Sequence, residues 1–192
     1  MTLTSPHPHF IAGNWQASEH TRPNINPSNI SESVGDYCEA GAAEVDAAVR
    51  AAQAALPEWC HSTPQQRFDV LDFIGTEILA RKQELGTLLA REEGKVLPEA
   101  IGEVARAGYI FKFFAGEALR LAGQALASVR LGMEVFTSRE AVGVVALITP
   151  WNFPIAIPAW KAAPALACGN TVVLKPSELT PACAWALTEI IS

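Results

Sequence analysis

Two short apolar segments near the end of the 192-residue chain, with a helical segment between them, constrain the fold more than any other feature. Residues 142–148 are a nearly unbroken apolar run, which is typical of a strand covered on both faces of a sheet. Residues 171–175 are short and rich in β-branched side chains. Residues 155–168 have helical character, and Pro164 is expected to kink that helix. This order predicts a parallel strand–helix–strand unit and an α/β fold.

Polar residues follow both predicted strands at the point where each strand ends. The first strand stops at Pro150, in a turn that carries Trp151 and Asn152. The second strand ends at Lys175, shortly before Glu178. In an open parallel sheet, ligands bind outside the carboxyl ends of the strands. The sequence therefore predicts a ligand site formed by these two loops.

Asn152 provides a neutral side-chain donor on a turn stiffened by Pro150 and Pro154. Such a donor can stabilise an oxyanion that develops on a carbonyl oxygen. The alternative is that the amide only satisfies backbone groups of a tight turn. Without further context, the residues favour this structural role.

The loop after the second strand contains residues suited to a nucleotide. In nucleotide-binding folds, a carboxylate near the end of strand two accepts hydrogen bonds from the adenosine ribose, and Glu178 lies close to that position. Lys175 can hold a ribose hydroxyl or a 2′-phosphate. The alternative is a solvated turn, which the spacing alone favours. No G-x-G-x-x-G motif follows the first strand, which argues against a standard dinucleotide site.

The residues before this unit predict a hairpin, a loop and several helices. Residues 10–15 alternate around Gly13 as in a short hairpin. Residues 21–36 are rich in Pro, Asn and Ser and are expected to form a loop. Helices are predicted from apolar periodicity and from capping residues. They cover residues 44–56, the segment after Thr63-Pro64, residues 83–93 up to Gly94, the segment after Pro98 and the segment after Thr180-Pro181.

Residues 125–140 change to an alternation of apolar and polar side chains, which predicts a two-stranded ribbon that turns near Gly132. An amphipathic ribbon outside a core often pairs with another subunit. From the pattern alone, a hairpin packed on its own domain is an equal alternative.

The composition narrows the class of partner. The net charge is −6 and no Lys/Arg cluster offsets it, so nucleic acid is not an expected partner. The N-terminus has no signal-peptide pattern, so secretion is not expected. Prolines and Lys161 interrupt the apolar segment 142–168, so no membrane span is expected. The four cysteines form no CxxC pair and have no histidine at metal-ligand spacing. We therefore expect no metal site, and reduced cysteines as in a cytoplasmic protein.

Several motifs, in order along the chain, closely resemble those of the aldehyde dehydrogenase superfamily. They are Phe10-Ile-Ala-Gly-Asn-Trp15, Phe113-Phe114-Ala115-Gly116, Thr149-Pro150-Trp151-Asn152-Phe153-Pro154, Trp160-Lys161, Pro164-Ala165-Leu166-Ala167, Gly169-Asn170 and Lys175-Pro176-Ser177-Glu178. The resemblance implies the N-terminal portion of that family's α/β fold, truncated within its cofactor-binding domain. It divides the chain into an N-terminal hairpin and helices (1–124), an oligomerisation β-ribbon (125–141) and the incomplete start of a Rossmann-like NAD(P)-binding unit (142–192).

The resemblance also assigns roles to site residues. Asn152 matches the donor to the oxyanion of the thiohemiacetal, and the expected catalytic residues of this chain are limited to it. The residues expected to bind NAD or NADP are Ile148, Thr149, Pro150, Trp151 and Asn152 on the nicotinamide side, and Lys175, Pro176, Ser177 and Glu178 at the adenosine ribose. Phe153 and Trp160 match positions near the tunnel through which the aldehyde arrives. The family also lacks the usual glycine fingerprint, which removes the objection raised above.

The implied activity is NAD(P)-dependent oxidation of a small aldehyde to the carboxylic acid by a homo-oligomer. Among branches of the family, the chain most resembles the α-ketoglutaric semialdehyde (2,5-dioxovalerate) dehydrogenases. The family's nucleophilic cysteine and basic glutamate match positions beyond Ser192, so the isolated chain is expected to oxidise no aldehyde. The alternative is a non-catalytic remnant that binds nucleotide weakly or associates through its ribbon. Lys175 and Ser177 tolerate a 2′-phosphate whereas Glu178 favours a free ribose, which leaves NAD and NADP both open.

Overall fold

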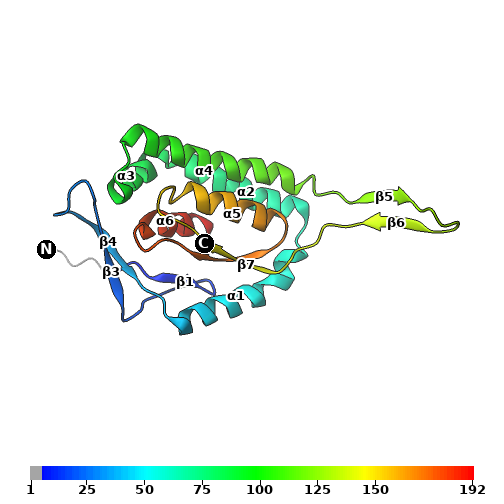
Figure 1. Ribbon diagram of the computed structural model, residues 1–192, viewed down its shortest axis with the longest axis horizontal. Helices are drawn as coiled ribbons and strands as arrows, with labels where there is room; N and C mark the ends of the chain where they lie inside the picture. Colours follow the sequence, from blue (N-terminus) through cyan, green and yellow to red (C-terminus); the bar gives the residue numbers. More distant parts are fainter. Residues whose placement is uncertain (1–5) are drawn as a thin grey trace.

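A computed structural model describes residues 6–192 of the chain. Figure 1 shows α2, α4 and α5 on one side of strand β7, α1 on the other, and the β5–β6 ribbon extending away from the body. The strands are β1 (His9–Ile11), β2 (Asn14–Gln16), β3 (Thr21–Ile25), β4 (Ser33–Cys38), β5 (Gln124–Ala127), β6 (Glu134–Thr137), β7 (Val144–Ile148) and β8 (Thr171–Lys175). The helices are α1 (Ala42–Cys60), α2 (Pro64–Ala80), α3 (Lys82–Glu93), α4 (Leu97–Ala118), α5 (Ala156–Ala167) and α6 (Pro181–Ile191).

The predicted strand–helix–strand unit is present as β7, α5 and β8. The two strands are parallel and in register, with Val144 opposite Thr171 and Ile148 opposite Lys175. The expectation that the first strand is covered on both faces is wrong. Leu147 is buried, but Ile148 is 68% exposed. Helix α5 packs on one face of the strand pair and α1 packs on its other side, and the last residues of β7 extend past that cover.

The segment 21–36, expected to be a loop, forms most of an antiparallel hairpin instead. Strands β3 and β4 pair from Thr21 opposite Cys38 to Ile25 opposite Ser33. Pro23 is tolerated because β3 pairs with β4 alone and so has a free edge. The hairpin is held to the helices by Asn24, whose side chain is buried and donates to Glu92 over 2.6 Å. One of the polar residues that suggested a loop, Asn24, is therefore a buried residue that joins the hairpin to α3.

Two helix boundaries, the start of α2 and the end of α3, are those that the local sequence predicts. Thr63 accepts a hydrogen bond from the backbone amide of Gln66 over 3.2 Å, and the Gln66 side chain returns one to the Thr63 amide over 2.8 Å. Gly94 ends α3 in the left-handed conformation, with φ of 82°. Helices α2 and α4 approach closely at Gly75 and Gly108, where a Cβ atom on either residue would meet the other helix at less than 3 Å.

One continuous core lies among α2, α3, α4, α5 and α6. Its fully buried large side chains include Leu71, Ile74, Ile78, Leu85, Leu89, Val104, Phe111, Ile155 and Leu187. Leu147 of β7 also belongs to this cluster. The strand pair is thus fixed to the helices by apolar packing on the side of α5.

The ribbon formed by β5 and β6 is antiparallel, with Leu126 opposite Val135 and Ala125 opposite Phe136. Every residue of both strands is exposed. Figure 1 shows the ribbon projecting from the ends of α4 and β7. The alternative in which this hairpin packs on its own domain is therefore wrong.

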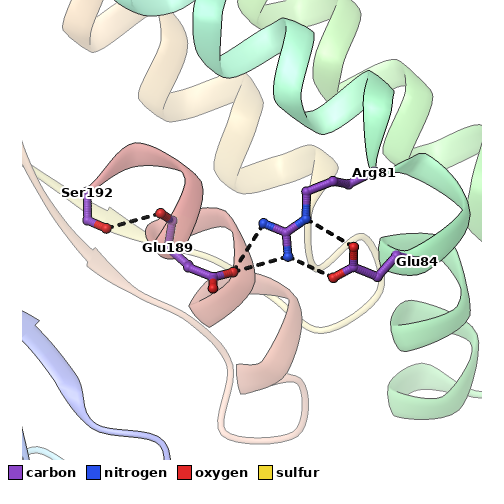
Figure 2. A network of polar contacts seen from close by, with 4 residues as sticks. All are labelled: Arg81, Glu84, Glu189 and Ser192. Atoms are coloured by element: carbon purple, nitrogen blue, oxygen red, sulfur yellow. Dashed lines mark hydrogen bonds and ion pairs between the residues drawn. The ribbon is translucent and has the colours of Figure 1, made fainter.

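Helix α6 is held at both ends by side chains from distant elements. Glu92, near the end of α3, accepts hydrogen bonds from the backbone amides of Ala182 and Cys183. The Thr180 side chain, expected to cap this helix, makes no capping bond, because Glu92 already binds the free amides. At the other end, Arg81 binds Glu84 over 2.7 Å and Glu189 over 3.1 Å (Figure 2). Both links cross from α6 to the α2–α3 region.

Replacing Glu92 tests how much this distant cap contributes. Glu92→Leu leaves Asn24 and the Ala182 and Cys183 amides without their acceptor, so we expect the free energy of unfolding to fall by about 2–4 kcal/mol. The measurement is urea unfolding followed by circular dichroism. The control is Glu84→Leu, which removes an exposed ion pair and should cost less than about 1 kcal/mol. Equal losses in the two variants would contradict the capping role.

Candidate functional site at the strand ends

Both predicted site loops leave the same edge of the β7–β8 sheet. Ile148 and Lys175 are the last residue pair of the strands, and the Thr149 amide extends the ladder by donating to the Lys175 carbonyl over 3.2 Å. The turn after β7 and the loop after β8 are therefore neighbours. The structure brings the two halves of the predicted site together, as expected for strands that run in parallel.

The turn after β7 is fixed at its ends and exposed in its middle. Thr149 and Pro154 are buried, whereas Trp151 is 55% exposed and Phe153 is 41% exposed. Asn152 is exposed, and within residues 6–192 its side-chain amide has no hydrogen-bond partner. The interpretation in which this amide satisfies the backbone of its own turn is wrong. The amide is free to bind a group outside the turn.

The loop after β8 presents a charged pair to solvent and buries a hydroxyl group. Lys175 and Glu178 form an ion pair with a 3.3 Å separation, and both side chains are more than half exposed. The Glu178 backbone amide and Lys175 lower the pKa of the Glu178 carboxyl, which is therefore ionised at neutral pH. Ser177 is buried and its hydroxyl accepts a bond from the Leu179 amide over 3.2 Å. Pro176, between them, is partly buried.

The residues expected near the aldehyde path lie beside the turn. Phe153 is on the turn itself, and Trp160 is on α5 and 42% exposed. The next residue, Lys161, donates from its ammonium group to the Ile148 carbonyl over 3.1 Å. The end of β7 is therefore bound both to β8, through the Thr149 amide, and to α5, through Lys161.

Three charged residues that sequence reasoning missed lie behind the turn. The Lys95 ammonium donates to the backbone carbonyl of Asn152 over 3.1 Å. Lys95 also forms ion pairs with Glu93 and Glu103. Glu103 accepts from the amides of Ile155 and Ala156 at the start of α5, each over 3.3 Å. Lys95 and Glu103 are more than fifty residues from the groups of the turn and of α5 that they bind, so no local motif could indicate these contacts.

None of the four cysteines lies on either of the two loops at the strand ends. Cys183, in the first turn of α6, is buried, and burial together with Glu92 raises the pKa of its thiol. Cys168 caps the far end of α5, at the opposite edge of the strand pair. Cys38 is on β4 and Cys60 ends α1.

The described residues hold no metal-ligand cluster. Between residues 6 and 192, no three His, Cys, Asp or Glu side chains gather closely enough to hold a metal ion. No helix in this part of the chain is both long enough and apolar enough to cross a membrane.

Comparison with known proteins decides the family. A sequence model described as the aldehyde dehydrogenase family matches residues 15–192. The chain belongs to the aldehyde dehydrogenase family. One relative, the alpha-ketoglutarate semialdehyde dehydrogenase of Haloferax volcanii, is 46% identical over 181 residues, which cover 93% of this chain and 38% of the relative.

Solved structures of the family share the fold. An E. coli NADP-dependent enzyme superposes with a TM-score of 0.94 at 35% identity, over 97% of this chain and 39% of that one. A point mutant of betaine aldehyde dehydrogenase from Staphylococcus aureus, in complex with NAD⁺, gives a TM-score of 0.92 at 33% identity, over 96% of this chain and 38% of that one. The chain thus spans about two-fifths or less of the length of the dehydrogenases that it matches. The α/β arrangement expected for the N-terminal portion of the family fold is confirmed.

A buried asparagine fixes the strand pair from the edge opposite the site. Asn170 accepts from the amides of Val142 over 2.7 Å and Gly143 over 3.0 Å, and it donates to the Ala165 carbonyl over 3.1 Å. It therefore joins the start of β7 to the end of α5. Because β7 carries the Asn152 turn at its other end, Asn170 helps to fix the position of that turn relative to α5.

Asn170→Ala should lower the free energy of unfolding by about 1–3 kcal/mol, because a buried side chain loses three hydrogen bonds, to the amides of Val142 and Gly143 and to the Ala165 carbonyl. Chemical denaturation of the variant measures this loss. Asn14→Ala is the matched control, because Asn14 makes an exposed bond within its own turn and should change stability by less than about 0.5 kcal/mol. An Asn170 variant as stable as this control would show that the strand pair is held by packing alone.

Proposed function

We propose that the protein containing this chain oxidises an aldehyde to a carboxylic acid with NAD or NADP. The observation that carries the proposal is the exposed, unbonded amide of Asn152, on a fixed turn at the edge where Lys175 and Glu178 also lie. In this role the Asn152 amide donates to the carbonyl oxygen of the aldehyde as negative charge develops there. A neutral donor suits this step because it stabilises the oxyanion without taking part in proton transfer.

The strand-end edge has the groups that an adenosine ribose requires. Glu178 is ionised and exposed, so its carboxylate can accept hydrogen bonds from ribose hydroxyls, and Lys175 beside it can donate. Residues 148–152 then contact the nicotinamide end, and Pro176 and Ser177 shape the loop under the ribose. When bound, the nicotinamide supplies hydride acceptance. The family match with NADP-dependent and NAD⁺-complexed structures supports either cofactor.

The 192-residue chain by itself oxidises no aldehyde in this proposal. The reaction needs a thiolate that attacks the carbonyl carbon, and no cysteine of this chain lies on the Asn152 turn or on the loop after β8. The chain contributes the oxyanion donor and the cofactor edge. If it functions alone, it is a weak nucleotide-binding or self-associating module, and residues 142–192 and the ribbon carry those properties.

The substrate and assembly follow from separate observations. The 46% identity to an alpha-ketoglutarate semialdehyde dehydrogenase favours a semialdehyde such as 2,5-dioxovalerate as substrate. The ribbon, residues 125–141, is an oligomerisation arm, because its strands are exposed throughout and carry Leu126 and Phe136. Residues 1–124 then frame the cofactor unit that begins at residue 142.

Asn152→Ala tests the oxyanion role in the protein that contains this chain. We expect kcat with 2,5-dioxovalerate to fall about 100- to 1,000-fold, because one preorganised donor is lost from the transition state. The affinity for NAD(P)⁺, measured by calorimetry, should fall far less than kcat, because the backbone of the turn, Lys175 and Glu178 are unaltered. Asn29→Ala, in an exposed turn, is the control. Full activity in the Asn152 variant, or oxidation of aldehyde by the 192-residue chain alone, would overturn the proposal.

Glu178→Gln tests the ribose contact. Replacing the carboxylate with a neutral amide weakens the hydrogen bonds to the ribose and removes repulsion of a 2′-phosphate, so the ratio of NAD⁺ to NADP⁺ affinity should fall about tenfold. Calorimetric titration with each nucleotide measures the ratio. Glu134→Gln on the ribbon removes one exposed carboxylate elsewhere and should leave it unchanged. An unaltered ratio in the Glu178 variant would place the ribose at other residues.

A further inference from the structure

The backbone of the Asn152 turn is held from behind by one ammonium group. The Lys95 ammonium lies 3.1 Å from the Asn152 carbonyl oxygen and 4.2 Å from the centre of the Phe153 ring. The first contact fixes the peptide that follows Asn152, and the second fixes the next side chain. Rotation of the turn would break both contacts together.

Lys95 is itself held firmly. Its side chain is only 13% exposed, and its ammonium lies 2.6 Å from Glu103 and 3.0 Å from Glu93. Burial acts to lower the pKa of Lys95. The hydrogen bonds that its ammonium donates to Glu103 and Glu93, together with the negative charges of these carboxylates, outweigh burial and raise the pKa. The group is therefore charged, and its position is set by α3 and α4.

Glu103 extends the same cluster to the far end of the turn. Its carboxylate binds Lys95 through one oxygen and the amides of Ile155 and Ala156 through the other. These amides open α5, where the helix dipole favours a negative group. The segment 152–156 is thus bound at its beginning by Lys95 and at its end by Glu103. Neither contact involves the Asn152 side chain, which stays free.

We propose that Lys95, held by Glu93 and Glu103, is a positioning residue that fixes the Asn152 amide in its donor geometry. This inference rests on the proposed function for its kinetic consequence. Its structural consequence, an immobile turn at residues 149–156, does not depend on that function. Small displacements of a catalytic group have large effects on rate, so a loosened turn should act on the chemical step.

The test is Lys95→Met, which keeps much of the stem and removes the charge. In the dehydrogenase that contains this chain, kcat should fall about ten- to 100-fold, with NAD(P)⁺ affinity unchanged. In an Asn152→Ala background the same substitution should have little further effect, because the two residues act through one interaction. Glu93→Gln removes one partner of Lys95 and provides a milder variant if Lys95→Met does not fold.

Hydrogen–deuterium exchange supplies a readout without catalysis. Amides of residues 149–156 should exchange faster in Lys95→Met than in the unmodified protein. The control is Lys112→Met, which removes an ammonium paired with Asp72 over 2.6 Å, away from the turn, and should leave this segment and kcat unchanged. Unchanged exchange, or a loss of activity of equal size with and without Asn152, would overturn the inference. An unmodified protein with no aldehyde activity would reject the proposed function, and the exchange result would still decide the role of Lys95.

Discussion

Two buried carboxylates connect the helical frame to the site. Each of the strands β7 and β8 is followed by a loop and then by a helix, and each of these helices begins at a glutamate from elsewhere in the fold. Glu103 binds the first amides of α5, and Glu92 binds those of α6. A buried carboxylate is costly unless donors surround it, and the free amides of a helix start are suitable donors. The loops before these helices are fixed as a result.

The balance of charge differs between the two carboxylates. Glu103 has the Lys95 ammonium as a partner, whereas Glu92 is bound by neutral donors, and burial raises its pKa. An ion cluster therefore lies behind the Asn152 turn, and a neutral-donor cap lies behind the loop with Lys175 and Glu178. The ion cluster holds the backbone of Asn152 and the start of α5. The cap of α6 mainly joins that helix to the β3–β4 hairpin through Asn24.

The features that were predicted correctly from the sequence are those that depend on short-range interactions. The capping box at Thr63, the left-handed Gly94 and the strand at residues 171–175 each depend on neighbours within a few residues, and each is present. Residues 21–36 were misassigned because Asn24 is satisfied by Glu92, 68 residues away. The Asn152 turn was predicted from its motif, but Lys95, between α3 and α4, and Glu103, on α4, were not, because tertiary packing brings them to a turn about fifty residues away in the chain.

The edge that carries Asn152, Lys175 and Glu178 is determined within this chain, although the chain spans only about two-fifths of the length of its relatives. The exposed side chain of Ile148 and the projecting ribbon leave surfaces uncovered, but the contacts that set the edge are made by backbone groups and by other side chains. Asn170 fixes the start of β7 to the end of α5, and the β7–β8 ladder sets the register of the two strands. Glu103 and Lys95 hold the loop after β7, and Glu92 holds the loop after β8. The relative positions of Asn152, Lys175 and Glu178 therefore follow from the packing of helices α2–α6 with the strand pair, and any segment that packs at this edge meets an Asn152 turn that is already in place.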